Sequence, residues 1–267
     1  MSDSPFKLEL VQVSKTFTGQ GRTPVRAVED VTLRVSPARF VSIIGPSGCG
    51  KSTLFNLIAG LLQPSSGQVL MDGQEIAGTA GLVAYMLQKD MLLPWRTVLD
   101  NVILGLEVMG GPRRESVAVA QPLLERYGLG GFERHYPRAL SGGMRQRVAL
   151  LRTLLYDREI ILLDEPFAAL DAQTRLLLQE WLLTLWQDFR KTILLVTHDI
   201  DEAIFMSDEV YVMSARPGRI RAHLKVPLPR PRDEQTVTTP EFIALKRQAL
   251  AMLTEEARRA EALERAS

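Results

Sequence analysis

Residues 45–53 carry the strongest chemical signal in this 267-residue sequence. They read G-P-S-G-C-G-K-S-T and fit the phosphate-binding pattern G-x-x-x-x-G-K-[ST]. In that pattern, glycines let successive backbone N–H groups turn toward a phosphate, the lysine reaches the outer phosphates, and the following serine ligates Mg²⁺. We therefore predict a nucleotide site made by Gly45, Pro46, Ser47, Gly48, Cys49, Gly50, Lys51, Ser52 and Thr53.

The sequence around this loop predicts the elements that such a site needs. Residues 40–44 form a short apolar run before it, and apolar residues repeat at helical spacing after it, at Leu54, Leu57, Ile58 and Leu61. A buried strand then leads into the loop, and the loop opens onto a helix N-terminus whose dipole favours an anion. The alternative, a glycine-rich turn that matches by chance, does not explain these flanks.

Acidic residues end a second apolar run, residues 160–163. Carboxylates at the carboxyl end of a parallel strand stand where ligands bind. We therefore expect Asp164 to hold Mg²⁺ and Glu165 to orient or deprotonate an attacking water, the alternative being a solvated strand end. His198 follows a third apolar run, residues 192–197, and we expect it to contact a γ-phosphate instead of serving only as a structural histidine.

Three further positions have weaker local signals. Gln88 follows the apolar run 82–87, at the point where a strand gives way to a loop. Phe17 is either an ordinary packing residue or the aromatic ring on which an adenine stacks, and we favour stacking. A polar helix start within residues 140–147 is a weak candidate for a second phosphate contact, through Ser141 as N-cap with Gly142 and Gly143.

The composition is that of a globular protein, with 46% hydrophobic residues, 24% charged residues and a net charge of +1. The near-neutral charge argues against a general nucleic-acid binder. No stretch approaches the ~18 apolar residues of a membrane span, and the first residues lack a signal pattern, so we expect a cytosolic chain. Cys49 is the single cysteine. We read it mainly as a small loop residue, with the hypothesis that its alkylation blocks nucleotide binding and that ATP protects it.

Periodicity predicts the remaining elements. Alternating residues at 8–13 and 31–35 indicate half-exposed antiparallel strands at a sheet edge, joined by a polar loop. Residues 89–154 turn helical. Further strands are expected at 68–71 and 82–87, and residues 209–213 with 218–221 are expected to form a closing hairpin. One helix is expected to start at residue 97, and others to cover 115–127, 148–155 and 174–189.

The C-terminal part is expected to contain a linker and a helix. Prolines alternate with arginines in residues 227–232, which is typical of an extended linker. Thr239 and Pro240 then predict an N-cap and the first residue of a helix. The last dozen residues are strongly charged, and we expect a solvated or frayed tail.

In this order the motifs resemble the nucleotide-binding subunit of an ATP-binding cassette (ABC) transporter, over about residues 7–222. The family's signature L-S-G-G-Q is matched by residues 140–144, with Met144 in place of the final glutamine. By this resemblance, Gln88 is the Q-loop glutamine and Asp164-Glu165 the Walker B pair. Residues 168–171 are the D-loop and His198 is the switch histidine.

Segments 93–102, 164–171, 174–175 and 196–203 are similar to the nitrate, sulfonate and taurine importer ATPases in particular. Arg39, Leu87 and residues 151–153 depart from the family pattern, and none of them is a catalytic position. The resemblance implies an importer for a small anion such as nitrate, sulfonate or taurine. An ATPase that serves lipid or peptide export is an alternative, and so is a soluble ABC ATPase that acts on nucleic acid or ribosomes, although those usually carry two cassettes or a coiled-coil insertion.

The resemblance also implies an architecture. The fold class is α/β, a P-loop NTPase ABC cassette with a RecA-like core, an antiparallel β subdomain and an inserted α-helical subdomain. The ATPase domain would cover residues 7–226, with the helical subdomain at about 89–155, and residues 227–267 would form the linker and C-terminal helix.

The implied mechanism uses two copies of the chain as a homodimer that sandwiches two ATP molecules head to tail. Each ATP would lie between Lys51, Ser52 and Gln88 of one copy and the helix start at Ser141 of the other. Mg²⁺ would sit with Ser52, Gln88 and Asp164. The implied partners are transmembrane permease subunits and, indirectly, a solute-binding protein, without nucleic acid, at the cytoplasmic face of the inner membrane.

Overall fold

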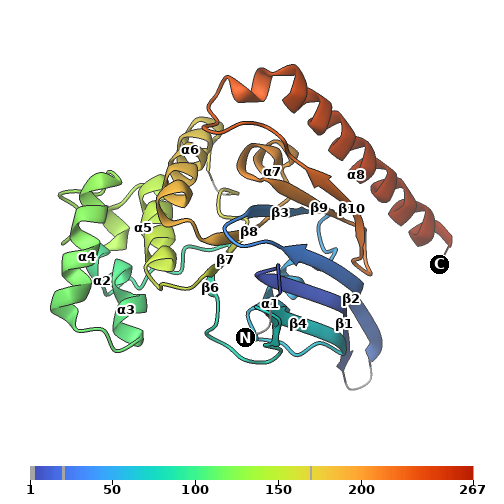
Figure 1. The fold of residues 1–267 in the computed structure, drawn as a ribbon, viewed down its shortest axis with the longest axis horizontal. Helices are drawn as coiled ribbons and strands as arrows, with labels where there is room; N and C mark the ends of the chain where they lie inside the picture. The colour runs from blue at the N-terminus through green and yellow to red at the C-terminus, as the bar shows by residue number, and fades with distance from the viewer. Residues whose placement is uncertain (1–3, 20–21, 169, 267) are drawn as a thin grey trace. The chain divides into compact units, whose positions relative to one another are not determined.

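A computed structural model describes residues 4–19, 22–168 and 170–266. The chain divides into two compact units, one formed by residues 1–83 with 190–267 and the other by residues 84–189 (Figure 1). The boundaries expected above for the ATPase domain and its helical subdomain stay predictions. Ala169 of the expected D-loop lies outside the described residues.

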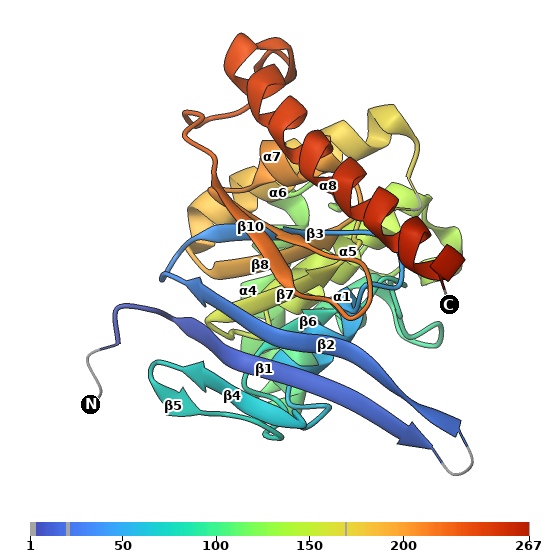
Figure 2. The ribbon, with the colours of Figure 1, turned by 90° about the vertical axis from the view of Figure 1, so that its right-hand side faces the viewer.

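An antiparallel sheet in the first unit has the order β2-β1-β4-β5 (Figure 2). Leu8 of β1 faces both Val35 of β2 and Met71 of β4, so the antiparallel pairing is confirmed. The expectation that both strands lie at a sheet edge is wrong for β1, because it has a partner on each side. The strands are β1 (Leu8–Gly19), β2 (Arg22–Val35), β4 (Ser66–Met71) and β5 (Gln74–Glu75).

The polar loop expected between the first two strands is mostly strand, which corrects the sequence prediction. β1 continues to Gly19, and Phe17 pairs with Val25 of β2. Register shifts interrupt the ladder between Leu10 and Gly19. Such bulges break the alternation of apolar and polar residues, so the pattern in the sequence ends before the strand does.

Parallel strands form the second sheet region of the first unit. β3 pairs in parallel with β8 and β9, and β10 runs antiparallel to β9, which confirms the closing hairpin. Every residue of β3 and β8 is buried, as their continuous apolar runs predict. Helix α7 (Ile200–Met206) packs on β3 and β8, and α1 (Lys51–Ile58) follows β3. The strands are β3 (Phe40–Ile44), β8 (Thr192–Thr197), β9 (Glu209–Met213) and β10 (Ile220–Lys225).

The segment 226–232, which we call the C-terminal strap, has neither helix nor strand, as a linker would, but it packs against the end of α7. The Arg232 side chain is 5% exposed. The last carbonyls of a helix lack intrahelical partners, and a guanidinium satisfies several at once. Arg232 donates to four backbone carbonyls at 2.8–3.0 Å, those of Ile204, Phe205, Ser207 and Leu228.

Helix α8 (Pro240–Ala266) follows η2 (Thr236–Thr238). The Thr239 hydroxyl accepts a hydrogen bond from the Phe242 N–H at 3.3 Å, which confirms the predicted cap. Of the two alternatives for the tail, solvated or frayed, the frayed one is wrong for the described backbone, because the helix continues to Ala266. Glu256 in the tail is 5% exposed and pairs with Arg221 of β10 at 3.2 Å.

The second unit contains two parallel strands, β6 and β7, and a group of helices in which α2 packs against α4 and α5 (Figure 1). The strand expected at 82–87 is shorter, and the helix expected from residue 97 is in two pieces that meet at Ile103. The elements are β6 (Ala84–Met86), α2 (Val98–Val102), α3 (Leu104–Val108), α4 (Arg113–Arg126), η1 (Pro137–Ala139), α5 (Gly142–Leu154), β7 (Ile160–Asp164) and α6 (Ala172–Phe189).

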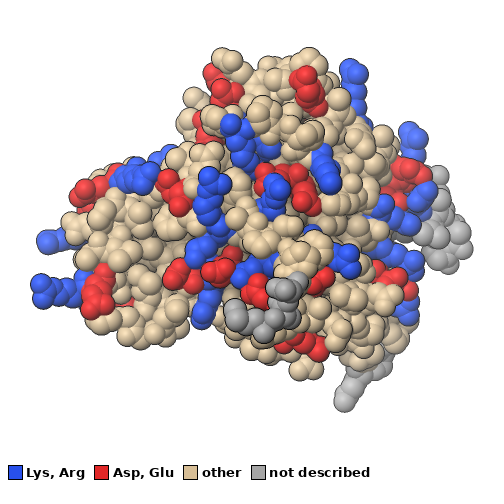
Figure 3. Space-filling model, viewed as in Figure 1, with Lys and Arg blue, Asp and Glu red and all other residues tan. Residues whose placement is uncertain are grey.

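Among the described residues, no helix is long and apolar enough to cross a membrane. Lysine and arginine side chains are interspersed with aspartate and glutamate over the face that Figure 3 presents. This mixture agrees with the net charge of +1.

Candidate nucleotide-binding site

The predicted phosphate loop has the expected strand–loop–helix form in the first unit. β3 ends at Ile44, the loop follows, and α1 begins at Lys51. Gly48 and Gly50 have φ angles of +73° and +108°, a conformation in which a side chain is strained. Gly50 is also the N-cap of α1, so the loop delivers its N–H groups at a helix N-terminus.

The Lys51 side chain lies against the loop itself. Its ammonium donates to the carbonyl oxygens of Gly45 at 2.8 Å and Pro46 at 3.1 Å, and the residue is 7% exposed. Ser52 and Ser47 are exposed and Thr53 is half-buried. The loop therefore combines a buried positive charge with an exposed hydroxyl, the pair that a Mg²⁺-bound phosphate needs.

Cys49, a residue of this loop, is buried, at 1% exposure. Burial raises the pKa of its thiol, although the positive charge of Lys51, whose Nζ lies 3.9 Å from Sγ, acts against that shift. A protonated and inaccessible thiol reacts slowly. The hypothesis that alkylation blocks nucleotide binding therefore requires the loop to open before the reagent can enter.

His198 reaches the same edge of the first unit as the phosphate loop. Ile44 at the end of β3 pairs in parallel with Thr197 at the end of β8, so Gly45 and His198 each follow one of two paired residues. His198 is exposed. The next residue, Asp199, caps α7 and accepts hydrogen bonds from the N–H groups of its first turn, those of Asp201 at 2.9 Å and Glu202 at 3.1 Å.

The second unit brings Gln88 together with the acidic pair. Met86 of β6 pairs in parallel with Leu163 of β7, so Gln88 and Asp164 lie at the carboxyl ends of neighbouring strands. The Gln88 amide donates to Glu165 Oε2 at 3.2 Å. Glu165 itself has a φ of +47°, which turns the chain sharply after the buried Asp164.

Tyr85 is a neighbour of Asp164 that no sequence motif marks as a site residue. Its hydroxyl donates to Asp164 Oδ2 at 3.3 Å. Burial raises the pKa of Tyr85, and the charge of Asp164 raises it further, so the phenol remains a hydrogen-bond donor. A tyrosine within an otherwise apolar strand was the available signal, because a buried phenol needs a partner.

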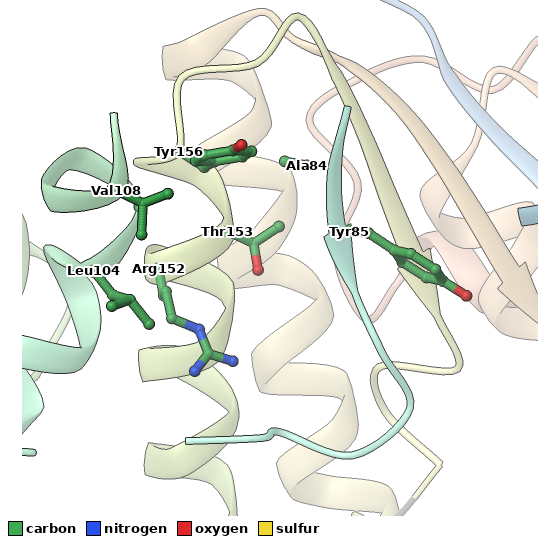
Figure 4. A pocket seen from close by; sticks show the side chains of 8 residues that line it. Ala84, Tyr85, Leu104, Val108, Arg152, Thr153 and Tyr156 are labelled. Carbon is green, nitrogen blue, oxygen red and sulfur yellow. The ribbon is translucent and has the colours of Figure 1, made fainter. Parts of the chain in front are cut away.

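A pocket of about 250 Å³ lies beside β6, α3 and α5, and Arg152 and Tyr156 are among its lining residues (Figure 4). The Tyr85 ring points away from these two side chains, as Figure 4 shows. Arg152 donates to the carbonyls of Met91 at 2.8 Å and Asp90 at 2.6 Å, so its charge helps to hold the segment after Gln88.

The helix start expected at Ser141 is confirmed, although α5 begins at Gly142, earlier than predicted. The Ser141 hydroxyl accepts from the Met144 N–H at 3.3 Å. A Cβ on Gly143 would lie 3.0 Å from the Thr174 side chain, so a glycine suits this position. The exposed Ser141 and Gly142 leave the helix N-terminus open to solvent in this chain.

Phe17 is 42% exposed, and Lys15 Nζ lies 5.5 Å from the centre of its ring. Its exposure disfavours the alternative of an ordinary core residue. The ring remains a candidate surface for adenine stacking.

The predicted Mg²⁺ ligands have suitable chemistry. Ser52 offers a hydroxyl, Asp164 a carboxylate and Gln88 an amide oxygen, and hard cations prefer such oxygens. The described residues contain no cluster of three or more histidine, cysteine or acidic side chains that could hold a metal on their own. Oxygens of the nucleotide's phosphates and of water would complete the coordination.

Comparison with known proteins gives a consistent result. A family model described as ABC transporter matches residues 28–168. An uncharacterized ABC transporter ATP-binding protein of Methanocaldococcus jannaschii is 47% identical over 250 residues, which cover 94% of this chain and 92% of that protein. The taurine import ATP-binding protein TauB of Yersinia pestis is 46% identical over 200 residues, 75% of this chain and 78% of that one.

Solved structures agree with these sequence matches. A bacterial ABC transporter cassette solved as a dimer has a TM-score of 0.72 and 32% identity, covering 82% of this chain and 98% of that one. The same cassette in a post-hydrolysis state with ADP and phosphate has a TM-score of 0.70 and 31% identity. The α/β cassette fold is confirmed.

Proposed function

This chain belongs to the ABC transporter family as an ATP-binding subunit with ATPase activity, and we propose that it powers an importer for a small anion, of the nitrate, sulfonate or taurine class. The observation that carries the importer assignment is the similarity to the taurine import protein over three quarters of the chain. The transported solute would not touch this subunit. A solute-binding protein and a membrane permease would select it.

We propose catalytic roles from the position of each residue in the fold and from its place in the family's motifs. Lys51 and His198 would hold the γ-phosphate, since both lie at the edge where β3 and β8 end. Glu165 would orient or deprotonate the attacking water, and its hydrogen bond from Gln88 would fix the carboxylate. Ser52, Gln88 and Asp164 would hold Mg²⁺, which neutralises charge on the phosphates when bound. Phe17 would stack on the adenine.

We propose that two copies act together as a head-to-tail dimer. The open N-terminus of α5, at Ser141, Gly142 and Gly143, would then contact the nucleotide held by the phosphate loop of the partner copy. Such an arrangement closes by two-fold symmetry. The dimeric state of a related cassette supports it. The dimer would associate with permease subunits at the cytoplasmic face of the membrane.

The catalytic assignment is tested by Glu165→Gln in the purified chain, measured for ATP binding and for ATP turnover. We expect nucleotide binding to persist while turnover falls by about 10²–10⁴-fold, because a general base is lost and the phosphate contacts remain. Glu159→Gln is a matched control, since Glu159 is exposed and precedes the opposite end of β7. Normal turnover in Glu165→Gln would exclude Glu165 as the base.

The importer assignment is tested by affinity purification of the subunit from membranes of its native host. We expect a permease and a solute-binding protein to co-purify, and the ligand of that binding protein would identify the solute. Recovery of a permease with no solute-binding protein would favour an exporter. Recovery of ribosomes or DNA instead would overturn the transporter assignment and leave the ATP site standing.

A further inference from the structure

Residues 214–219 connect β9 to β10 and form a compact loop, which we call the brace loop. Ser214 is 4% exposed and organises it from inside. Its single hydroxyl proton is shared between the carbonyls of Ala215 at 2.8 Å and Pro217 at 3.0 Å, and its oxygen accepts from the Arg219 N–H at 3.0 Å. The brace loop therefore has a fixed internal shape.

The brace loop is attached to β2 by backbone and side-chain contacts. The Gly218 N–H donates to the Ala27 carbonyl at 3.0 Å, and the Glu29 N–H donates to the Gly218 carbonyl at 2.9 Å. Arg219 pairs with Glu29 at 2.6 Å. The two backbone bonds of Gly218 extend the sheet edge across to the brace loop and hold it in one position, while the Arg219–Glu29 pair lies at the solvent-exposed rim and adds little.

From that position the brace loop contacts the outer side of the phosphate loop. The Arg216 guanidinium donates twice to the Gly48 carbonyl, from Nε at 3.2 Å and from Nη2 at 3.0 Å. A Cβ on Gly218 would lie 2.1 Å from the Cys49 carbonyl oxygen, so the two backbones meet closely enough to require glycine.

The peptide bond between Gly48 and Cys49 connects Arg216 to the phosphate-binding residues. Its carbonyl is bonded to Arg216, and its N–H donates to the Pro46 carbonyl at 3.3 Å on the opposite side of the planar unit. The Pro46 carbonyl also accepts from Lys51 Nζ at 3.1 Å. A chain of hydrogen bonds thus runs from Arg216 through one peptide to the phosphate-binding lysine.

We propose that the brace loop pre-organises the phosphate loop and that Arg216 is a positioning residue for nucleotide binding. Arg216 holds the carbonyl side of the Gly48–Cys49 peptide, whose N–H side is held by the Pro46 carbonyl, and so limits its rotation next to the flexible Gly48. Ordering this loop before binding removes an entropic cost from association. The inference rests on nucleotide binding at the phosphate loop, which the proposed function also requires.

The test is the dissociation constant of ADP, measured by calorimetry with Mg²⁺ for the purified full chain and three variants. We expect Arg216→Ala to weaken ADP binding about tenfold, because part of the loop would then be ordered only when ADP binds, and Arg216→Lys to restore part of the affinity. Arg219→Ala is the matched control, because Arg219 lies in the same loop but pairs with Glu29 of β2. We expect it to bind ADP within about twofold of the wild type, since an exposed ion pair contributes little.

A second readout separates positioning from a general loss of structure. Because Arg216 is exposed, its loss should leave the urea midpoint of unfolding nearly unchanged while the KM for ATP rises more than kcat falls. Wild-type affinity in Arg216→Ala would overturn the proposal, and so would an equal loss in Arg219→Ala. A wild-type chain that binds no ADP would overturn both this inference and the proposed function, whereas binding unaffected by Arg216→Ala would overturn the inference alone.

Discussion

Replacing Gly50 with alanine tests how tightly β2 encloses the phosphate loop. A Cβ at this position would lie 2.7 Å from Val28 Cγ1 and 2.8 Å from the Ala27 carbonyl oxygen, and the φ angle is +108°. The left-handed backbone costs an alanine about 1–2 kcal/mol. Forcing the methyl group against the backbone of β2 adds about 1–3 kcal/mol. We therefore expect Gly50→Ala to lower the free energy of unfolding by about 2–5 kcal/mol in total.

Gly110→Ala provides the matched control for this substitution. Gly110 has a φ of +84°, and a Cβ there would meet nothing within 4 Å. Only the backbone cost of about 1–2 kcal/mol should then appear. Urea denaturation followed by circular dichroism measures both variants against the wild type.

The difference between the two variants isolates the steric contact. If Gly50→Ala and Gly110→Ala lose the same stability, the argument from close approach is wrong. Val28→Ala offers a double-mutant cycle, because it removes the Val28 Cγ1 contact and leaves the contact with the Ala27 carbonyl. We expect a favourable coupling of about 0.5–1 kcal/mol between Gly50→Ala and Val28→Ala, and the absence of coupling would locate the strain at Ala27 alone.

Three further outcomes are expected. Tyr85→Phe removes the hydrogen bond to Asp164, so the Mg²⁺ concentration for half-maximal ATPase activity should rise about threefold or more, while ADP binding without Mg²⁺ stays unchanged. An unaltered Mg²⁺ titration would exclude Tyr85 as a positioning group. Arg232→Met leaves four backbone carbonyls without their donor and should cost about 3–5 kcal/mol of unfolding free energy, measured by urea denaturation, with Arg232→Lys intermediate. Cys49 should react with iodoacetamide far more slowly than a free thiol at pH 8, and its rate should rise with pH, because the raised pKa keeps the thiol protonated. Urea that opens the loop should restore the rate, whereas rapid alkylation in native buffer would contradict the burial of Cys49.

Local chemistry made part of this structure predictable. Few sequences place glycines, a lysine and a serine in this order for another reason, so the phosphate loop follows from the residues 45–53 alone. The caps at Ser141 and Thr239 were predictable for a similar reason, because a hydroxyl before a helix has a specific task.

Contacts between distant segments could not be predicted in the same way. Phe17 lies in a strand because bulges conceal the alternation that defines one. Arg216 is 168 residues from the carbonyl that it holds, and nothing in the sequence pairs the two. Tyr85 reaches Asp164 only because of the register between β6 and β7, which periodicity does not determine.

The C-terminal strap has a consequence for where this chain can be shortened. Every motif that identifies the family lies before Val226, so a fragment ending there would retain the entire set by sequence. Such a fragment would lack Arg232, and the carbonyls at the end of α7 would have to be hydrated in a region that is now closed. His198, which we propose contacts the γ-phosphate, directly precedes Asp199, the N-cap of that short helix. A fragment that contains every motif can therefore be shorter than the shortest fragment expected to work, and expression designs should keep the C-terminal strap through Arg232.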